Sequence, residues 1–408
     1  MTIDPEGVLN AARQRQRELE QDGPRGPVHG VPVGLKDLFY TAGMKTTACS
    51  RIYADFVPTY DATAVARIKD AGGIILGKTV TTEFAFADPP PTVNPWNPAH
   101  TPGGSSTGSC VAVAARMCAA ALGSQTAGST CRPAAYHGIV GLKPTYGRIS
   151  RHGVVPLSWS QDTVGIVVRS VEDAAIMLQV MAGHDPNDPS SATGPVPDYL
   201  QEMNEQQRSP RIGLVKEFFS DRSIPEVWGH TEDVARRLAQ AGAKVEEIGL
   251  PESFATAHSC QNLVSNVEAA AFHEEFIRHR ADEYGPKVRA FIETGLMIPG
   301  VRYIQAQRLR RQLRQDLIEM VQRVDVVMTP AFPTPAPRDL NTTGDPVFQA
   351  PWTSAGLPTI VLPSGLADSG LPLAIQLAGL PLEEGKLLAT ARWCESALGV
   401  SLSPPRYS

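Results

Sequence analysis

The 408-residue chain lacks the long apolar runs, paired cysteines and charge blocks that mark several classes of protein. No stretch of ~18 apolar residues occurs, so the sequence predicts no membrane-spanning helix and no membrane partner. The six cysteines are scattered and contain no CxxC pair, which favours a reduced, cytoplasmic protein over a disulfide-linked one. Lys and Arg total 37 against 42 Asp and Glu, without a basic stripe, and this predicts no nucleic-acid partner.

What remains is the composition of a folded globular protein, with 42% hydrophobic and 19% charged residues. Gly and Pro number 35 each, which indicates many loops but not a low-complexity chain. The first 21 residues are polar, and they predict a helix over residues 5–21 rather than a secretory signal.

Short apolar segments alternate with helical patterns along most of the chain. Apolar runs without polar alternation are typical of strands that are buried on both faces, so the alternation predicts an α/β protein with a buried sheet. The expected strands are residues 31–35, 73–77, 138–142, 164–168, 326–328, 359–361 and 373–377, with another beginning near residue 211. The expected helices include residues 5–21, 61–71, 105–123, 171–182 and 384–398.

Residues 72–79 match the phosphate-loop pattern G-x4-G-K-[ST]. A phosphate loop needs small, flexible residues whose N–H groups turn inward, whereas the interior here is Ile-Ile-Leu. Isoleucines favour a strand, and a helical pattern precedes the segment instead of following it. We therefore interpret residues 72–79 as the end of a strand that carries a lysine.

A second formal motif, G-x-S-x-G, is centred on Ser106. In hydrolases that use this motif a strand leads directly into the serine, and a helix follows it. Residues 94–102 are rich in proline, which removes ladder donors, so they do not predict a central strand. A Ser-His-Asp hydrolase centred on Ser106 stays an alternative, with His137 as the nearest downstream histidine.

A third group of residues has the features of a catalytic site. Two Gly/Ser loops, residues 103–106 and 126–129, bracket a stretch of small residues, and Lys36 ends a short apolar strand upstream. A serine is a weak nucleophile that needs a base, and a desolvated lysine with a lowered pKa can be that base. Successive N–H groups in a Gly/Ala-rich turn can form an oxyanion hole. Most Gly/Ser loops are only turns, and the combination with the lysine is what indicates a site.

These residues resemble the amidase signature family, serine hydrolases with a Ser-cisSer-Lys triad. The central match covers residues 101–150, and flanking matches cover residues 29–50, 60–79, 162–178, 325–330 and 355–379. The resemblance implies one large domain over residues 1–408, in which a mixed central β-sheet is covered by helices on both faces. Its expected parts are a shortened N-terminal helical segment (1–28), a core with the triad (29–185), a variable helical region (190–325) and a C-terminal return to the core sheet (326–408).

The family pattern implies a role for each residue of this third group. Lys36, in its G-x-K-D stretch, matches the base, Ser105 matches the bridging cis-serine, and Ser129 matches the nucleophile that forms an acyl-enzyme. Ser106 is expected to support them, and no cofactor or metal is implied. The oxyanion hole is expected from the backbone N–H groups of Thr126, Ala127, Gly128 and Ser129.

The sequence departs from the commoner D-x-G-G-S motif, because Gln125 replaces the aspartate, Ala127 replaces a glycine, and the following arginine sits one place later, at Arg132. These departures argue against the glutamine-hydrolysing transamidosome subunit. We therefore expect a serine amidohydrolase for aryl amides, anilides or carbamates (urethanes). A glutamine amidotransferase A-like subunit stays an alternative, as does a non-catalytic member that acts as a subunit or binding scaffold.

Five aromatic residues are candidates for an apolar substrate wall, although each is more typical of packing. Of these, Phe84, Phe86 and Trp352 are the predicted substrate-binding residues, with Trp96 and Phe348 as further candidates. The expected partner is a small-molecule amide or carbamate substrate, and homodimers are common in the family.

Overall fold

A computed structural model describes residues 2–205 and 208–405. Within these residues ten strands form one mixed β-sheet in the order β2-β1-β3-β5-β4-β9-β10-β8-β6-β7. Strands β2, β1 and β3 run parallel, as do β8, β6 and β7, and each neighbouring pair from β3 to β8 is antiparallel. The strands are β1 (Pro32–Lys36), β2 (Ile74–Thr79), β3 (Ala120–Gln125), β4 (Val140–Lys143), β5 (Thr163–Val168), β6 (Arg211–Leu214), β7 (Lys244–Glu247), β8 (Val326–Pro330), β9 (Thr359–Leu366) and β10 (Pro372–Ala378).

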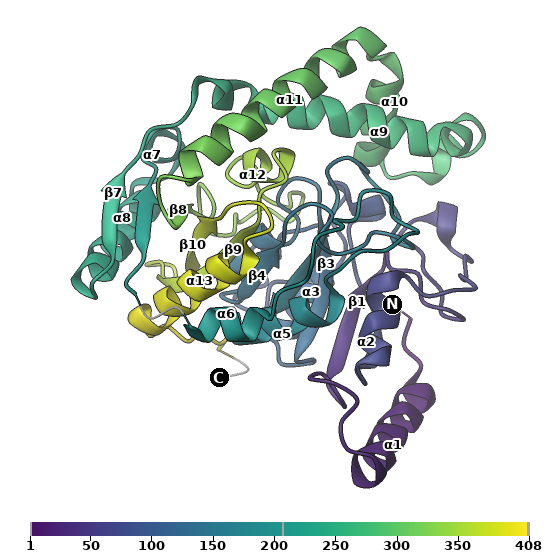
Figure 1. Cartoon of the computed structure of the whole chain (residues 1–408). Coiled ribbons are helices and arrows are strands. Elements are labelled where there is room, and N and C mark those ends of the chain that lie inside the picture. The colour runs from purple at the N-terminus through teal and green to yellow at the C-terminus, as the bar shows by residue number, and fades with distance from the viewer. Residues whose placement is uncertain (1, 206–207, 406–408) are drawn as a thin grey trace.

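Helices flank this sheet, which confirms the predicted α/β class (Figure 1). Figure 1 shows α9, α10 and α11 lying together on one side of the molecule, above α12. The helices are α1 (Pro5–Gln21), α2 (Thr63–Asp70), α3 (Thr107–Ala114), α4 (Cys131–Tyr136), α5 (Val171–Met181), α6 (Tyr199–Glu205), α7 (Phe219–Arg222), α8 (Pro225–Gln240), α9 (Ala257–Arg280), α10 (Pro286–Met297), α11 (Gly300–Val321), α12 (Ala350–Ser354) and α13 (Glu384–Leu398). Short 3-10 turns occur at Arg51–Tyr53, Glu83–Ala85, Glu252–Thr256 and Ala281–Glu283.

The central strands are buried on both faces, as the apolar run of β5 predicts. Every residue of β3, β4 and β5 is buried, and Ile166 and Val168 of β5 have no exposed surface. Burial of one such side chain stabilises a fold by about 1.5–3 kcal/mol, so the sheet interior contributes strongly to stability. These strands form the rigid base from which the loops of the site emerge.

The single helix predicted over residues 105–123 is wrong. Helix α3 ends at Ala114, and Arg116 has a φ of 59°, outside the helical region. Residues 120–125 form β3 between β1 and β5. A run of small apolar residues has no polar–apolar periodicity, so it does not distinguish a buried helix from a buried strand. The difference matters because β3 carries Ser124 and Gln125 into the site.

The region expected to be helical, residues 190–325, also extends the sheet. Strand β6 was expected from its apolar start, but β7 was not, because its sequence Lys-Val-Glu-Glu is charged and half exposed. A charged edge strand blocks further pairing, which is consistent with its place at the end of the sheet.

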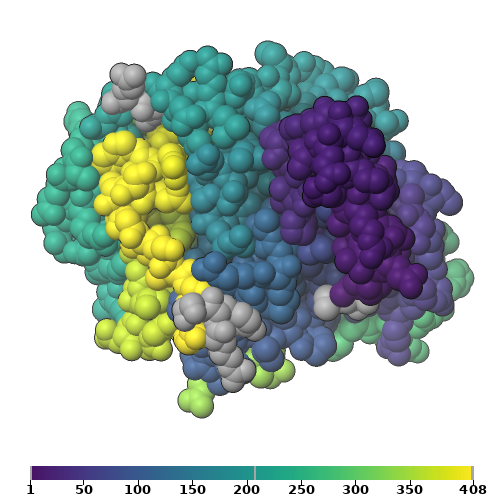
Figure 2. Space-filling model, turned by 90° about the horizontal axis from the view of Figure 1, so that it is seen from below, coloured from purple at the N-terminus to yellow at the C-terminus, as the bar shows by residue number. Residues whose placement is uncertain are grey.

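Helices α1 and α13, the first and last helices of the described residues, lie on one face of the molecule. Figure 2 shows α1 and α13 on this face, with segments from the middle of the chain between them. The N-terminal segment also contacts the sheet edge, since the N–H of Lys78 in β2 donates to the Thr2 carbonyl at 2.9 Å. None of the helices in the described residues is long and apolar enough to cross a membrane.

Candidate active site

Lys36 ends β1 and is completely buried. Its Nζ lies 2.7 Å from Ser105 Oγ and 2.8 Å from Ser124 Oγ. Burial lowers the pKa of Lys36 to about 7, against a weaker opposing effect of the Asp162 carboxylate. A large fraction of this amine is therefore neutral near neutral pH, and a neutral amine can accept a proton from Ser105.

The loop of residues 103–106 carries Ser105 to the lysine. The Gly104–Ser105 peptide bond is cis, and Gly103 has a φ of 70°, a left-handed conformation that glycine adopts without a steric penalty. The N–H of Ser106 donates to the Ser129 carbonyl at 3.1 Å, which fixes the two Gly/Ser loops against each other. Ser105 and Ser129 consequently line the same cavity.

The turn that carries Ser129 connects β3 to α4 and is held by the side chain of Gln125. Gln125 Oε1 accepts hydrogen bonds from the N–H groups of Thr130 at 3.0 Å and Cys131 at 2.9 Å. Gln125 Nε2 donates to Thr353 Oγ1 at 3.0 Å, and the Thr353 hydroxyl donates to the Ala127 carbonyl at 2.7 Å. The turn is thereby held in place by α12.

The backbone N–H groups of Ala127, Gly128 and Ser129 make no hydrogen bond to another group of the described chain. All three residues line the cavity, so these donors are available to a negatively charged oxygen there. A Cβ atom on Gly128 would lie 2.8 Å from Gln349 Oε1, so a side chain at this position requires Gln349 to shift. The predicted oxyanion-hole residues therefore lie together in one turn.

Asp162 holds the same turn from the opposite end. Thr126 Oγ1 donates to Asp162 Oδ1 at 2.5 Å, and the N–H groups of Leu157 and Ser158 donate to Asp162 Oδ2 at 2.8 and 2.9 Å. Burial raises the pKa of Asp162, and these hydrogen bonds oppose that effect. Asp162 thus links Thr126 to the loop that follows residue 156.

The cavity over Ser129 has a volume of about 290 Å³. Helix α9 contributes His258, Gln261 and Asn262 to its wall, and Phe86 contributes an aromatic face that stacks on Phe291 at 3.9 Å between ring centroids. The surface is therefore mixed, with one aromatic pair and several hydrogen-bonding groups. Such a cavity fits a small polar substrate.

Arg132 brings a buried positive charge to this cavity, with only 4% of its surface exposed. Its Nη2 donates to the Gly104 carbonyl at 2.8 Å and to Thr343 Oγ1 at 3.2 Å, whereas Nε and Nη1 have no partner in the described chain. Burial lowers the pKa of Arg132, and the exposed carboxylate of Asp345 opposes this from beyond ion-pair distance. A buried charge without a paired carboxylate is costly, and an anionic ligand would compensate it.

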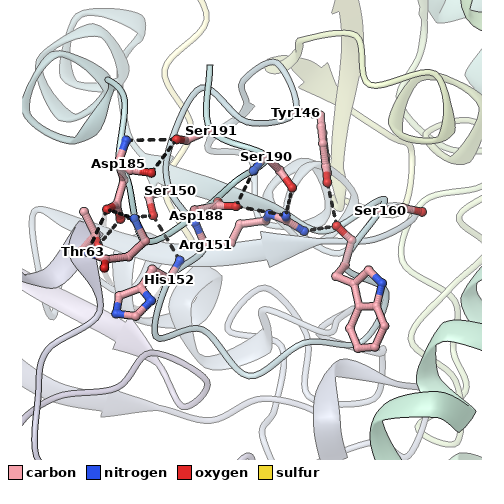
Figure 3. A network of polar contacts seen from close by, with 12 residues as sticks. Thr63, Tyr146, Ser150, Arg151, His152, Ser160, Asp185, Asp188, Ser190 and Ser191 are labelled. Atoms are coloured by element: carbon pink, nitrogen blue, oxygen red, sulfur yellow. Dashed lines mark hydrogen bonds and ion pairs between the residues drawn. The ribbon is translucent and has the colours of Figure 1, made fainter. Parts of the chain in front are cut away.

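A second cavity, of about 210 Å³, adjoins the first at Thr126 and Leu157. Ser124 and Asp162 line it, and its outer wall includes Arg151 and Asp188. Figure 3 shows Arg151 directed at Asp188 and Ser190, with Nη2 3.4 Å from Asp188 Oδ1 and 2.8 Å from Ser190 Oγ. This network fixes the outer wall of the second cavity.

The predicted aromatic substrate wall is largely wrong. Phe86 lines the active-site cavity, but Phe84 and Trp352 do not. Phe84 is 1% exposed and packs against Tyr53 and His273, and Trp352 has no exposed surface. Large aromatic side chains dominate cores as well as binding sites, so composition alone does not separate the two roles. Phe348 is likewise buried in the core.

Neither formal motif forms a site of its own. Ser106 Oγ donates to the Ser124 carbonyl at 3.3 Å and accepts from the Ser124 N–H at 3.2 Å. Ser106 therefore holds the backbone of Ser124, whose hydroxyl contacts Lys36. The ring of His137 contacts the Pro133 carbonyl instead of Ser106, so His137 is not the base of a Ser-His-Asp triad centred on Ser106. Lys78 is a buried strand residue whose Nζ donates to Thr41 Oγ1 and Thr46 Oγ1, both at 2.9 Å, as the strand interpretation of residues 72–79 expects.

Sequence reasoning gave no role at the site to Ser124, Thr353, Asp162 or Arg132, and it treated Gln125 only as a departure from the motif. Ser124 and Gln125 stand directly before the predicted oxyanion turn, and this position was the only available signal. Thr353 and Asp162 are distant in sequence and carry no motif. Among the described residues, no cluster of three or more His, Cys, Asp or Glu could hold a metal ion.

With this geometry in place, comparison with known proteins is informative. The chain matches the family model described as Amidase over residues 1–388. The A subunit of glutamyl-tRNA(Gln) amidotransferase from Geobacter metallireducens is 38% identical to it, over 97% of this chain and 89% of the relative. The solved structure of the corresponding A subunit from Thermotoga maritima has a TM-score of 0.79 at 30% identity, and covers 96% of this chain and 92% of that one.

A further solved structure has a TM-score of 0.91 at 28% identity, and covers 98% of this chain and 90% of that one. It is described as an unexpected vestigial protein complex that reveals the evolutionary origins of an s-triazine catabolic enzyme.

These relatives overturn two expectations. The expected hydrolase of aryl amides, anilides or carbamates is wrong, and the alternative of a glutamine amidotransferase A-like subunit fits better. The expected partner set, a small-molecule substrate without nucleic acid, is also wrong, because the relatives are named as one subunit of an enzyme for glutamyl-tRNA(Gln). Gln125 had argued against this group, yet its Oε1 accepts two N–H groups as a carboxylate oxygen does.

Proposed function

Since this chain belongs to the amidase family and is therefore an enzyme that cleaves C–N bonds, we propose that it is the glutamine-hydrolysing component of an amidotransferase. In this role it releases ammonia from glutamine through an acyl-enzyme on Ser129. The observation that carries the proposal is the buried guanidinium of Arg132, which lines the same cavity as Ser129 and lacks a paired carboxylate. The α-carboxylate of glutamine supplies that missing partner.

The proposed reaction begins with neutral Lys36. Ser129 attacks the side-chain amide carbonyl of glutamine while its proton passes to Ser105, whose own proton moves to Lys36 across the 2.7 Å contact. The resulting oxyanion accepts hydrogen bonds from the free N–H groups of the turn. Return of the proton to the departing nitrogen releases ammonia and leaves a γ-glutamyl ester on Ser129. Water then attacks the ester by the reverse relay and releases glutamate.

Two charges support glutamine as the substrate. Arg132 lies inside the cavity, and the carboxylate of Asp345 lies in its exposed wall. A zwitterionic amino acid places its carboxylate on the first and its ammonium on the second. Within the described residues the Asp345 carboxylate accepts only the Val347 N–H, on Oδ1 at 2.9 Å, so its second oxygen is available to an ammonium group.

The relatives' name also supports partners for this chain. We propose that further subunits bind it and that the released ammonia is used on glutamyl-tRNA, as the name of the relatives describes for them. The chain covers 89% of the Geobacter relative, so it contains most of what that protein contains.

The proposal is tested by ammonia release from three amides, measured with the chain alone and with the other subunits of its amidotransferase. L-Glutamine is compared with glutaramate, which lacks the α-ammonium, and with 4-aminobutanamide, which lacks the α-carboxylate. We expect glutamine to be the best substrate and 4-aminobutanamide to be the worst, because it leaves Arg132 unpaired. Equal kcat/KM for glutamine and 4-aminobutanamide, or full activity of Ser129→Ala, contradicts the proposal.

A further inference from the structure

Three arginines of α11 line a cavity that is separate from the active site. The cavity has a volume of about 300 Å³ and shares no lining residue with the cavity over Ser129. Helix α11 forms one wall, Tyr146 and Ser160 form another, and residues 354–356, at the C-terminal end of α12, form the third. Figure 1 shows α11 passing over α12, and residues of both helices line this cavity.

Arg310, Arg311 and Arg314 lack the ion pairs that other arginines of this protein make. No carboxylate of the described chain lies within 4.0 Å of their guanidinium groups, whereas Arg289 on the preceding helix pairs with both Asp282 and Glu293. Positions four residues apart lie on one face of a helix, so Arg310 and Arg314 project in the same direction. Their charges are therefore concentrated in one place and are not neutralised there.

Arg310 forms the base of the cavity. Its Nε donates to the Ser354 carbonyl, Nη1 donates to Ser160 Oγ at 2.8 Å, and Nη2 donates to the Ser160 carbonyl. These bonds engage most of its donors with neutral oxygens, which fixes the guanidinium but leaves its charge in place. Burial lowers the pKa of Arg310, yet an arginine stays charged in a protein.

Arg311 and Arg314 keep free donors. Arg314 Nη1 donates to the Ala355 carbonyl, and no other hydrogen bond from this side chain is found in the described chain. Arg311 is exposed at the cavity wall and makes no hydrogen bond to the described chain. Two guanidinium groups thus present unused N–H groups to one concave space.

The nearby carboxylates do not neutralise this charge. Glu268 on α9 partly compensates the charge of Arg310 from beyond ion-pair distance, and its Oε2 accepts hydrogen bonds from Ser158 Oγ at 2.5 Å and from the Ser160 N–H at 3.0 Å. This single carboxylate does not balance three guanidinium groups. Glu319 lines the groove that continues outward from Arg311 and Arg314, and it forms no ion pair with either. The cavity therefore has a surplus of positive charge.

We propose that this cavity is a binding site for a phosphate-type oxyanion. Arg311 and Arg314 donate hydrogen bonds to its oxygens, and Arg310 contributes a fixed charge at the base. A phosphate group matches a cluster of three cations better than a single carboxylate does, because it carries more charge and more acceptor oxygens. The source is either free phosphate or the phosphodiester of a nucleic acid, and the site is independent of the chemistry at Ser129.

The test is isothermal titration of the purified full chain with inorganic phosphate at constant ionic strength. Wild type is expected to bind saturably, and Arg311→Gln and Arg314→Gln are each expected to weaken binding by about tenfold. Arg308→Gln, an exposed change on the same helix outside the cavity, is the matched control and should bind as wild type does. Arg311 has no hydrogen bond to lose, so Arg311→Gln separates loss of binding from loss of folding.

Absence of saturable binding by wild type overturns the proposal, as does unchanged binding by Arg311→Gln or equal weakening by Arg308→Gln. A second arm repeats the phosphate titration on protein saturated with a single-stranded RNA oligonucleotide. Competition between RNA and phosphate identifies a phosphodiester as the source, and unhindered phosphate binding identifies free phosphate. Both results support the site.

Discussion

Gln125 Nε2 lies 3.0 Å from Thr353 Oγ1, and through this contact α12 holds the turn that carries Ser129. The same glutamine side chain accepts the N–H groups of Thr130 and Cys131, and Thr353 in turn donates to the Ala127 carbonyl. Gln125 is thus a positioning residue that sets where the oxyanion donors point. Mispositioned donors lose transition-state stabilisation without losing substrate binding.

Gln125→Leu should lower kcat by roughly 10- to 100-fold and leave KM nearly unchanged, because the turn loses its side-chain support. Steady-state ammonia release measures both constants. Gln179→Leu is the matched control, since Gln179 Oε1 accepts the Tyr199 N–H away from the site. A kcat loss in Gln125→Leu no larger than that in Gln179→Leu contradicts the positioning role.

The pH dependence of activity should follow the protonation state of Lys36. With its pKa lowered to about 7 by burial, the neutral form increases as the pH rises through that value. We expect kcat/KM to increase with pH, to have its midpoint near pH 7 and to be flat above it. A profile that continues to rise towards the ordinary lysine pKa of 10.5 is incompatible with this role.

Lys36 should also make folding stability depend on pH. Its folded-state pKa of about 7 lies below its ordinary value of 10.5, so between these values the unfolded chain binds more protons than the folded one. Wild-type stability should therefore gain up to about 1.4 kcal/mol per pH unit from this group as the pH rises through that window.

Lys36→Met removes this contribution, so it should stabilise the protein most below about pH 7 and progressively less towards pH 10.5. Denaturant unfolding of both proteins at several pH values measures the difference. Burial also lowers the pKa of Lys78 and of Lys143 to about 8, but these two lysines are present in both proteins, so their contributions cancel in the difference. Lys216→Met, at an exposed position, is the control. A stabilisation by Lys36→Met that is the same at every pH excludes a buried lysine with a lowered pKa.

Arg132→Met should affect the hydrolysis of glutamine and of 4-aminobutanamide to different degrees. Loss of the guanidinium should lower kcat/KM for glutamine by about 100-fold, since a charged hydrogen-bonded pair is lost, and should affect 4-aminobutanamide far less. The Gly104 carbonyl also loses its donor in this variant, but that loss is common to both substrates. An equal reduction for the two amides would mean that Arg132 only supports the Ser105 loop.

The sequence predicted those residues of the site that stand in a recognisable local pattern, such as the end of an apolar strand or a Gly/Ser loop. Lys36 follows a short apolar run, and Ser105 and Ser129 stand in Gly/Ser loops, so strand ends and turns could be recognised directly. Ser124 and Thr353 could not, because their contacts with Lys36 and Gln125 span 88 and 228 residues. Strand β3 was missed since its small apolar residues fit a buried helix equally well.

The substrate prediction was wrong for a related reason. Gln125 was interpreted as a departure that changes chemistry, although its hydrogen bonds preserve the geometry of the turn. Phe84 and Phe86 stand two residues apart, yet only Phe86 reaches the cavity, because a 3-10 turn at Glu83–Ala85 directs Phe84 into the core. Side-chain direction inside a short turn is not encoded in composition.

The assignment of Ser129 as a nucleophile activated by Lys36 is tested most directly by labelling with a fluorophosphonate and locating the modified residue by peptide mass spectrometry. We predict a single label on Ser129, slowed by glutamine, and strongly reduced in Lys36→Met because the base is absent. Labelling of Ser106 or another serine instead, or labelling of Ser129 at the wild-type rate in Lys36→Met, would contradict it.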